Sequence, residues 1–126
     1  MPVASSRASS LLAAAEGVNN AQGVRFASHG AAFLARQGVE TAMDGFWLAR
    51  APGVEVCSMR TQLICAPFHL PHHVAAGVNH TWWALTRVCH HHAYDLPPTP
   101  EELGDLLETA RGLVAELARL AGAERE

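Results

Sequence analysis

The segment TPEELGDLLETARGLVAELARLAG, residues 99–122, decides the fold class of this chain. Thr99 is a favourable N-cap, Pro100 fits the first helical position, and Glu102 completes a capping box with the cap residue. Leucine, valine and alanine then recur at three- and four-residue steps, which is the spacing of one apolar stripe on an α-helix. Gly122 is suited to ending the helix. The segment therefore predicts a long amphipathic helix that packs against other helices.

The N-terminal part of the chain predicts two further helices. The first is expected from about Ser6 to Glu16 and is broken by the Gly17–Asn20 stretch. The second is expected from roughly Ala21 to Ala49. Its glycines either weaken its interior or allow a neighbour to pack closely, because glycine costs about 1 kcal/mol against alanine in a helix. Six large apolar residues mark the expected buried face of the second helix: Phe26, Phe33, Leu34, Met43, Phe46 and Trp47.

The middle of the chain continues the helical pattern. APGVEVC, residues 51–57, reads as a loop, and the next segment holds a short helix that ends at Pro67. A new helix starts near Pro71 and runs toward the histidines around residue 90, followed by a rigid connection at 96–98. No segment alternates with the period of a strand. The prediction is an all-α bundle of four to five helices, with residues 1–126 as a single helical domain and a core over about 5–122.

Composition limits the possible functions. Hydrophobic residues make up 49% of the chain and charged ones 17%, as in globular proteins. The formal charge of −3 argues against a wide basic face that coats nucleic acid, although one or two arginines could still form a small phosphate site. All nine basic residues are arginine, which favours a GC-rich bacterial source. Three cysteines without a CxxC pair, no signal-peptide core and no membrane span favour a soluble cytoplasmic protein.

Two histidine-rich clusters raise the possibility of a metal site. HLPHH, residues 69–73, and CHHH, residues 89–92, contain side chains that zinc or another first-row transition metal binds. The spacing is poor, because consecutive residues on a helix point about 100° apart and cannot all bind one ion. A transition-metal enzyme or sensor is therefore the alternative hypothesis, and the expected cofactor is none. The candidate ligands of that alternative are His69, His73, Cys89 and His90.

The stretch RVCHHHAY, residues 87–94, suggests a different chemistry when the spacing between its residues is considered instead of its histidine content. Arg87, four residues, His92, one residue and Tyr94 form the pattern R-x4-H-x-Y at the end of a predicted helix. This pattern resembles the motif of HepT-type proteins in the HEPN superfamily of small helical bundles. The upstream helix is similar to the HEPN second helix over Gln37, Glu40, Ala42 and Met43. The resemblance covers roughly residues 5–122, but Val88 and Asp44 stand where the family often has Asn and Lys.

The resemblance implies metal-independent RNA cleavage by a homodimer. His92 would transfer protons, since histidine ordinarily titrates near pH ~6.5, and Arg87 would stabilise charge on the phosphoryl oxygens. In an ideal helix Arg87 faces His91, at i+4, better than His92, so His91 is a second candidate base. His90 is a polar residue that lines the site. Tyr94 is expected either to be adenylylated by a partner nucleotidyltransferase antitoxin or to fill space between helices.

Three further interpretations remain open at this stage. The protein could keep a HEPN fold without catalysis and bind a nucleotide or a protein partner. Trp82 and Trp83 could stack on a base, or they could belong to the core or to a dimer contact. Arg87 and the histidines are expected to lower the pKa of the Cys89 thiol, which would allow it to act as a nucleophile.

Overall fold

The computed structural model describes residues 3–21, 27–90 and 97–122. Within these ranges the chain forms five α-helices and two 3-10 turns and contains no strand, which confirms the all-α prediction. In order these elements are α1 (Val3–Asn20), α2 (Ala27–Arg50), η1 (Val54–Val56), α3 (Met59–Cys65), η2 (Ala66–Phe68), α4 (His72–Cys89) and α5 (Pro100–Gly122). No helix in the described part of the chain combines the length and apolar character needed to cross a membrane.

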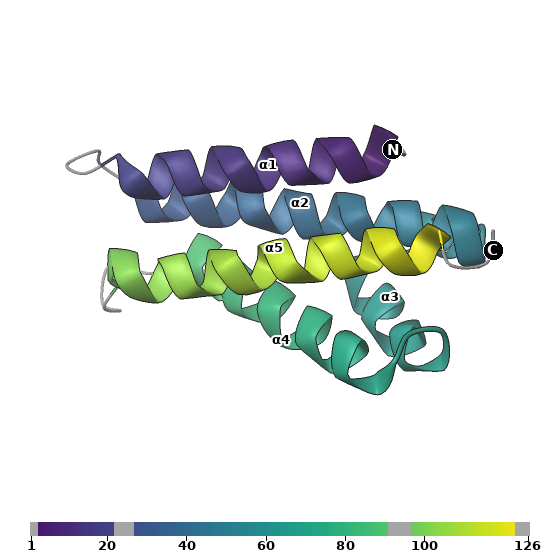
Figure 1. Ribbon diagram of the computed structural model, residues 1–126. Coiled ribbons are helices and arrows are strands. Elements are labelled where there is room, and N and C mark those ends of the chain that lie inside the picture. The colour runs from purple at the N-terminus through teal and green to yellow at the C-terminus, as the bar shows by residue number, and fades with distance from the viewer. Residues whose placement is uncertain (1–2, 22–26, 91–96, 123–126) are drawn as a thin grey trace.

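The other three long helices pack around α2. Helices α1, α2 and α5 lie lengthwise beside one another, with α1 running opposite to the other two, while α4 lies at an angle below them (Figure 1). Helix α2 contacts α1, α4 and α5, so it is the central element. The short α3 and the 3-10 turns connect the end of α2 to the start of α4.

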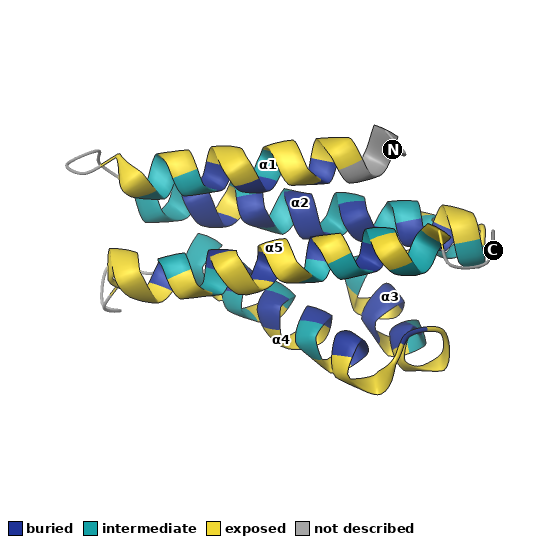
Figure 2. Cartoon of the chain, viewed as in Figure 1, coloured by how far each residue is buried: buried dark blue, intermediate teal, exposed yellow. Residues whose placement is uncertain are grey.

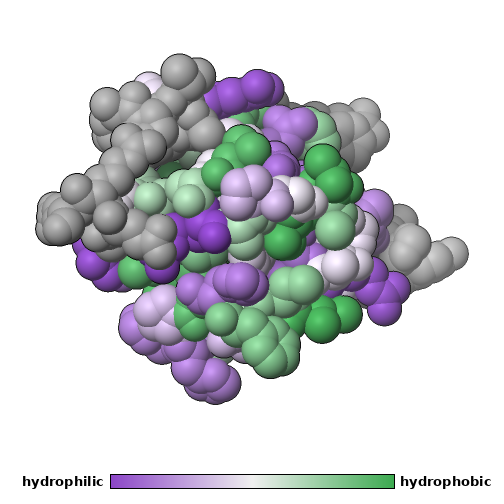
Figure 3. Space-filling view, turned by 90° about the vertical axis from the view of Figure 1, so that its right-hand side faces the viewer, coloured by the Kyte–Doolittle hydropathy of each residue, from purple (hydrophilic) through white to green (hydrophobic). Residues whose placement is uncertain are grey.

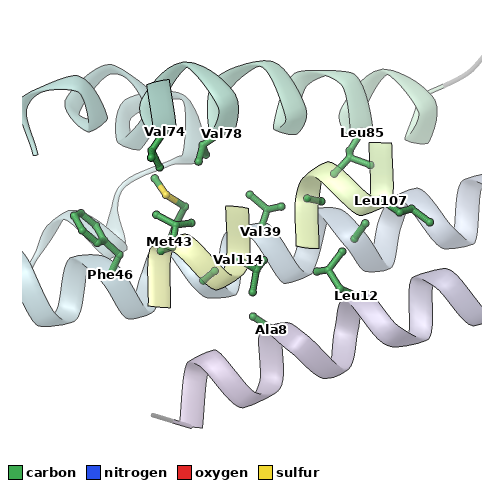
Figure 4. Packing of buried hydrophobic residues seen from close by; sticks show 14 of the residues in the cluster. Ala8, Leu12, Val39, Met43, Phe46, Val74, Val78, Leu85, Leu107 and Val114 are labelled. Carbon is green, nitrogen blue, oxygen red and sulfur yellow. The ribbon is translucent and has the colours of Figure 1, made fainter. Parts of the chain in front are cut away.

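The core forms where the apolar stripes of these helices meet. On α1, α4 and α5 the buried residues follow one side and the exposed residues the other, whereas α2 is buried or half-buried along most of its length (Figure 2). The largest buried side chains of α2 are Met43, Phe46 and Trp47. The residues packed around α2 include Ala8 and Leu12 of α1, Val74, Val78 and Leu85 of α4, and Leu107 and Val114 of α5 (Figure 4).

The last helix begins as its sequence predicts. The backbone N–H of Glu102 donates to Thr99 Oγ1 at 3.1 Å, and the backbone N–H of Thr99 donates to Glu102 Oε1 at 3.2 Å. This reciprocal pair is the predicted capping box, and it satisfies two backbone donors at the helix start. The five buried residues of α5 are Leu103, Leu107, Ala110, Val114 and Leu117.

The first two helices differ from their predicted bounds. Helix α1 continues through Gly17 to Asn20, so the predicted break at Gly17–Asn20 is wrong. Helix α2 begins at Ala27 instead of Ala21. Phe33 is 45% exposed instead of buried, and the Arg36 guanidinium lies 5.9 Å from the centroid of its ring. Phe26 lies outside the described residues.

A glycine allows α1 and α2 to approach closely. A Cβ added at Gly38 would lie 2.2 Å from Leu12 Cδ2 and 3.3 Å from the backbone oxygen of Ala8. Both distances are shorter than ordinary van der Waals contact. The sequence allowed the α2 glycines either to weaken the helix or to permit close packing, and Gly38 therefore permits close packing.

A buried hydrogen bond holds α3 against α2. The indole N–H of Trp47 donates to Gln62 Oε1 at 3.0 Å, and Gln62 Nε2 donates to the backbone oxygen of Cys57 at 2.9 Å. Gln62 is one of two buried polar side chains among the described residues, and these bonds compensate its burial. Residues 51–57, predicted as a loop, contain η1 and the left-handed Gly53 with φ of 112°.

The end of the molecule near α3 exposes several large apolar side chains. Figure 3 views this end, where hydrophobic groups interrupt the hydrophilic surface. Leu48 of α2, Val56 of η1, Ile64 of α3 and Phe68 of η2 are exposed by 57% to 84%. Only part of the apolar surface of α3 is therefore buried in the core.

Candidate functional site

Arg87 lies on the exposed side of the last turn of α4. The helix ends at Cys89, and His90 is its C-cap with φ −104° and ψ 23°, outside the helical range. The backbone N–H of His90 donates to the Thr86 oxygen at 3.0 Å, which closes the final turn. The sequence placed the candidate bases His91 and His92 and the candidate modification site Tyr94 directly after this point, and all three lie outside the described residues.

The helix end changes the geometry expected for Arg87 and the histidines. The preference of Arg87 for His91 over His92 assumed an α-helix that continues past residue 91. Because α4 ends at Cys89, the rotation per residue of an ideal helix no longer decides between the two histidines. Both stay candidate bases.

Four exposed residues form one row on α4. They are His80, Trp83, Arg87 and His90, separated by three, four and three residues, and all four are exposed. This spacing places side chains on one side of a helix. We call these four residues the α4 face. His90, predicted as a polar lining residue and, in the alternative hypothesis, as a metal ligand, belongs to this row.

The two tryptophans before the motif have different surroundings. Trp82 is half-buried, and its indole N–H donates to Glu40 Oε2 at 2.9 Å. Arg36 Nε lies 3.7 Å from the same oxygen, so a cation partly compensates the Glu40 carboxylate. The Trp82 bond joins α4 to α2 across the surface of the bundle.

Trp83 packs against Trp82 and faces outward. The two ring centroids are 4.8 Å apart with an interplanar angle of 78°, an edge-to-face contact. Trp83 is 40% exposed. Trp82 is therefore a structural residue, whereas Trp83 presents part of its ring to the surroundings.

The residues that carry the resemblance in α2 have different roles. Ala42 and Met43 are buried in the core, and Gln37 is half-buried. Glu40 is the member of this set that contacts α4, through Trp82. The match in α2 therefore marks mostly packing positions, together with one carboxylate that holds α4 in place.

The expected activation of Cys89 is wrong. Burial raises the pKa of this thiol above its ordinary value, Arg36 lowers it to a smaller extent, and Glu40 raises it. The neighbouring Arg87 points to the exposed side of α4, whereas Cys89 packs against the core. A raised pKa disfavours the thiolate at neutral pH, which is the opposite of the effect expected from Arg87 and the histidines.

The candidate metal ligands are not brought together. His69 directly follows η2 and His73 lies in the first turn of α4. Cys89 and His90 lie at the other end of α4, about 25 Å from His73 at 1.5 Å per helical residue. Over residues 3–21, 27–90 and 97–122, no three His, Cys, Asp or Glu side chains are placed to hold one ion. The His69 ring instead makes an edge-to-face contact with Trp47, with centroids 5.3 Å apart.

One feature of the charge distribution escaped the sequence prediction. Residues 56–94 contain no Asp or Glu, yet they carry Arg60, Arg87 and seven of the eight histidines. Helix α5 by contrast carries five carboxylates: Glu101, Glu102, Asp105, Glu108 and Glu116. The formal net charge of −3 does not show this uneven distribution along the chain. A count of charge along the chain would have found it.

Comparisons with protein-family models, with curated proteins and with solved structures each found no match to the chain. The resemblance to HEPN proteins therefore depends on the motif and its place in the helical order.

Proposed function

We propose that the protein has a HEPN-like bundle and cleaves RNA as a homodimer, without a metal. The proposal is supported above all by the position of Arg87. This arginine is exposed on the last turn of a helix that ends two residues later, and the histidine run follows directly. A phosphate-binding arginine and a histidine base are the two groups that this reaction requires.

The local charge also favours a phosphate at this end of α4. No carboxylate lies between residues 56 and 94 of the sequence, so nothing on α4 itself repels an anion. Glu40, which contacts α4 through Trp82, is near Arg36. An acidic protein can bind a phosphate where its carboxylates are excluded or paired.

The proposed reaction is an internal transesterification. The imidazole of His92 takes the proton of the ribose 2′-hydroxyl, and the 2′-oxygen forms a bond to the adjacent phosphorus. The bond from phosphorus to the 5′-oxygen breaks, and an imidazolium returns a proton to that oxygen, leaving a 2′,3′-cyclic phosphate. Arg87 donates hydrogen bonds to the phosphoryl oxygens as their negative charge increases. His91 is the second candidate for the base.

The dimer and the regulatory partner belong to the same proposal. Two copies of the motif at one cleft would supply one histidine as base and another as acid. Tyr94 would be the acceptor of a nucleotide transferred by a nucleotidyltransferase antitoxin, which would block the cleft. A HEPN-fold protein without activity would bind a nucleotide or a protein partner instead.

The test is cleavage of single-stranded RNA by untagged protein in excess EDTA. Cleavage that leaves cyclic phosphate ends and is lost in Arg87→Ala and His92→Ala supports the proposal. His91→Ala identifies the base by comparison. Arg7→Ala, an exposed arginine of α1, is the matched control and keeps full activity. Cleavage that requires stoichiometric zinc or survives both motif substitutions would refute the proposal, and absence of cleavage would favour the inactive binding protein.

A further inference from the structure

We infer that the α4 face binds single-stranded nucleic acid, with a base stacked on Trp83 and phosphates along His80, Arg87 and His90. This inference rests on the proposed function only in taking RNA, and not DNA, as the natural ligand. It assigns a substrate-binding role to His80 and Trp83, which lie outside the R-x4-H-x-Y motif, and to His90 within its span.

The first argument is the exposure and support of Trp83. Its neighbour Trp82 is held by Glu40 at 2.9 Å and contacts Trp83 edge-on. Trp82 therefore limits the movement of the Trp83 ring, while 40% of Trp83 stays exposed. An exposed and supported aromatic ring is what single-strand binding proteins use to stack a base.

The second argument is the polar groups on either side of this ring. His80 lies about one turn before Trp83, and Arg87 lies about one turn after it. An imidazole N–H and a guanidinium both donate hydrogen bonds to phosphate oxygens. From His80 to His90 the face extends about 15 Å, the length of a short single-stranded segment.

The third argument is charge complementarity. The α4 face has one formal positive charge, three polar or aromatic neighbours, and no carboxylate on its own helix. At the far end of the same helix, His73 is close enough to Glu116 of α5 to contribute, after Arg119, to the lowered pKa of that carboxyl. At the Trp83 end of the helix, Glu40 contacts Trp82, and Arg36 partly compensates its carboxylate.

A single strand fits this surface better than a duplex does. In a duplex the bases are paired and stacked on one another, so their faces are not accessible to a side chain on a convex helix. An acidic protein segment would use Arg87 but would leave the Trp83 ring without a planar partner. The combination of ring and phosphate donors points to unpaired nucleotides.

The probe that tests this inference is a short labelled single-stranded DNA, which lacks the 2′-hydroxyl and cannot be cleaved by the proposed reaction. Binding is followed by anisotropy of the label and by quenching of tryptophan fluorescence. Trp83→Ala is expected to weaken binding about tenfold, as for loss of one base–aromatic stack, and Trp83→Phe recovers part of the loss. Arg87→Gln is expected to reduce the slope of log K against log salt by about 0.7.

Matched controls separate the α4 face from general effects. Phe68→Ala removes another exposed aromatic ring, and Arg7→Gln removes another exposed arginine; both should bind like the parent. Circular dichroism establishes that each variant is folded. If Trp83→Ala disturbs the helix, two milder variants provide the test. Trp83→Phe and His80→Gln are each expected to weaken binding several-fold.

Failure of this inference is distinguishable from failure of the proposed function. Binding of the DNA strand without any RNA cleavage would support the α4 face and remove the nuclease. RNA cleavage with unchanged binding in Trp83→Ala would keep the nuclease and overturn the α4 face. Equal affinity for duplex and single strand, stronger binding to vesicles containing phosphatidylserine, or no binding to either RNA or DNA would also overturn it.

Discussion

Replacing Gly38 by alanine tests the close contact between α1 and α2. A Cβ at this position would lie 2.2 Å from Leu12 Cδ2, against about 3.5–4.0 Å for a normal carbon contact. Leu12 is fully buried, so any movement of its side chain takes place within the core. The backbone oxygen of Ala8, at 3.3 Å, limits the movement from the other side. The substitution therefore requires the two helices to separate or Leu12 to adopt a strained rotamer.

Two opposing contributions determine the magnitude. Overpacking of a well-packed core costs about 1–3 kcal/mol. Alanine in place of glycine in a helix recovers about 1 kcal/mol. We expect Gly38→Ala to lower the free energy of unfolding by up to about 2 kcal/mol. At about 3–5 °C per kcal/mol for a chain of this length, the melting temperature falls by up to about 10 °C.

Gly112→Ala is the matched control, because Gly112 is inside α5 and an added Cβ there meets nothing within 4 Å. It should gain about 1 kcal/mol from helix propensity alone. Urea unfolding followed by far-UV circular dichroism measures both variants, and the difference of about 1–3 kcal/mol between them isolates the overpacking.

A double substitution identifies the clashing atoms. Leu12→Ala alone should cost about 2–5 kcal/mol, and it should cost less in the Gly38→Ala background because the removed methyl groups are the ones in the way. If Gly38→Ala stabilises the protein as much as Gly112→Ala does, the close contact between α1 and α2 is wrong.

Three further substitutions test other contacts. Thr99→Ala should lower stability by about 1 kcal/mol through loss of the capping box, while Thr99→Ser should not; equal melting temperatures would contradict the cap. Gln62→Leu leaves the buried Trp47 N–H without an acceptor and should cost about 1–3 kcal/mol in urea unfolding, with an unchanged midpoint counting against the bond. Burial, and next the charge of Glu40, raises the pKa of Asp44, so its ionised form opposes folding as pH rises above its ordinary value of 3.8. Asp44→Asn should therefore gain a few tenths of a kcal/mol at neutral pH and lose that advantage in acid; a constant difference across pH titrations would argue against this cause.

Local signals predicted the start of α5 well. Thr99, Pro100 and Glu102 act on their own backbone within one turn, so no tertiary contact was needed to locate the helix start. The same holds for α4, whose start after Pro71 follows from the fixed φ of proline.

Interior glycines misled the prediction of the N-terminal helices. Gly17 carries a propensity cost of only about 1 kcal/mol, which the packing of α1 against α2 and α5 outweighs. The exposure of Phe33 depends on which helix covers each side of α2, and this is a property of the assembled bundle.

The candidate site was predicted only in part. Arg87 is exposed at a helix end, as the motif required. The opposite environments of Trp82 and Trp83 were not predictable, because adjacent residues of one helix are distinguished only by what packs against them. Cys89 shows the same limit, since its neighbours in sequence suggested activation while its burial has the opposite effect.

Formal charge is distributed unevenly along the chain. Residues 56–94 carry Arg60 and Arg87 and no carboxylate, whereas α5 carries five carboxylates and two arginines. A polyanion that diffuses toward the protein is therefore repelled less by the segment 56–94 than by α5, which favours an approach with that segment toward it. The preferred orientation of the protein toward a polyanion thus follows from where the chain lacks acidic residues. This preference weakens as salt is added.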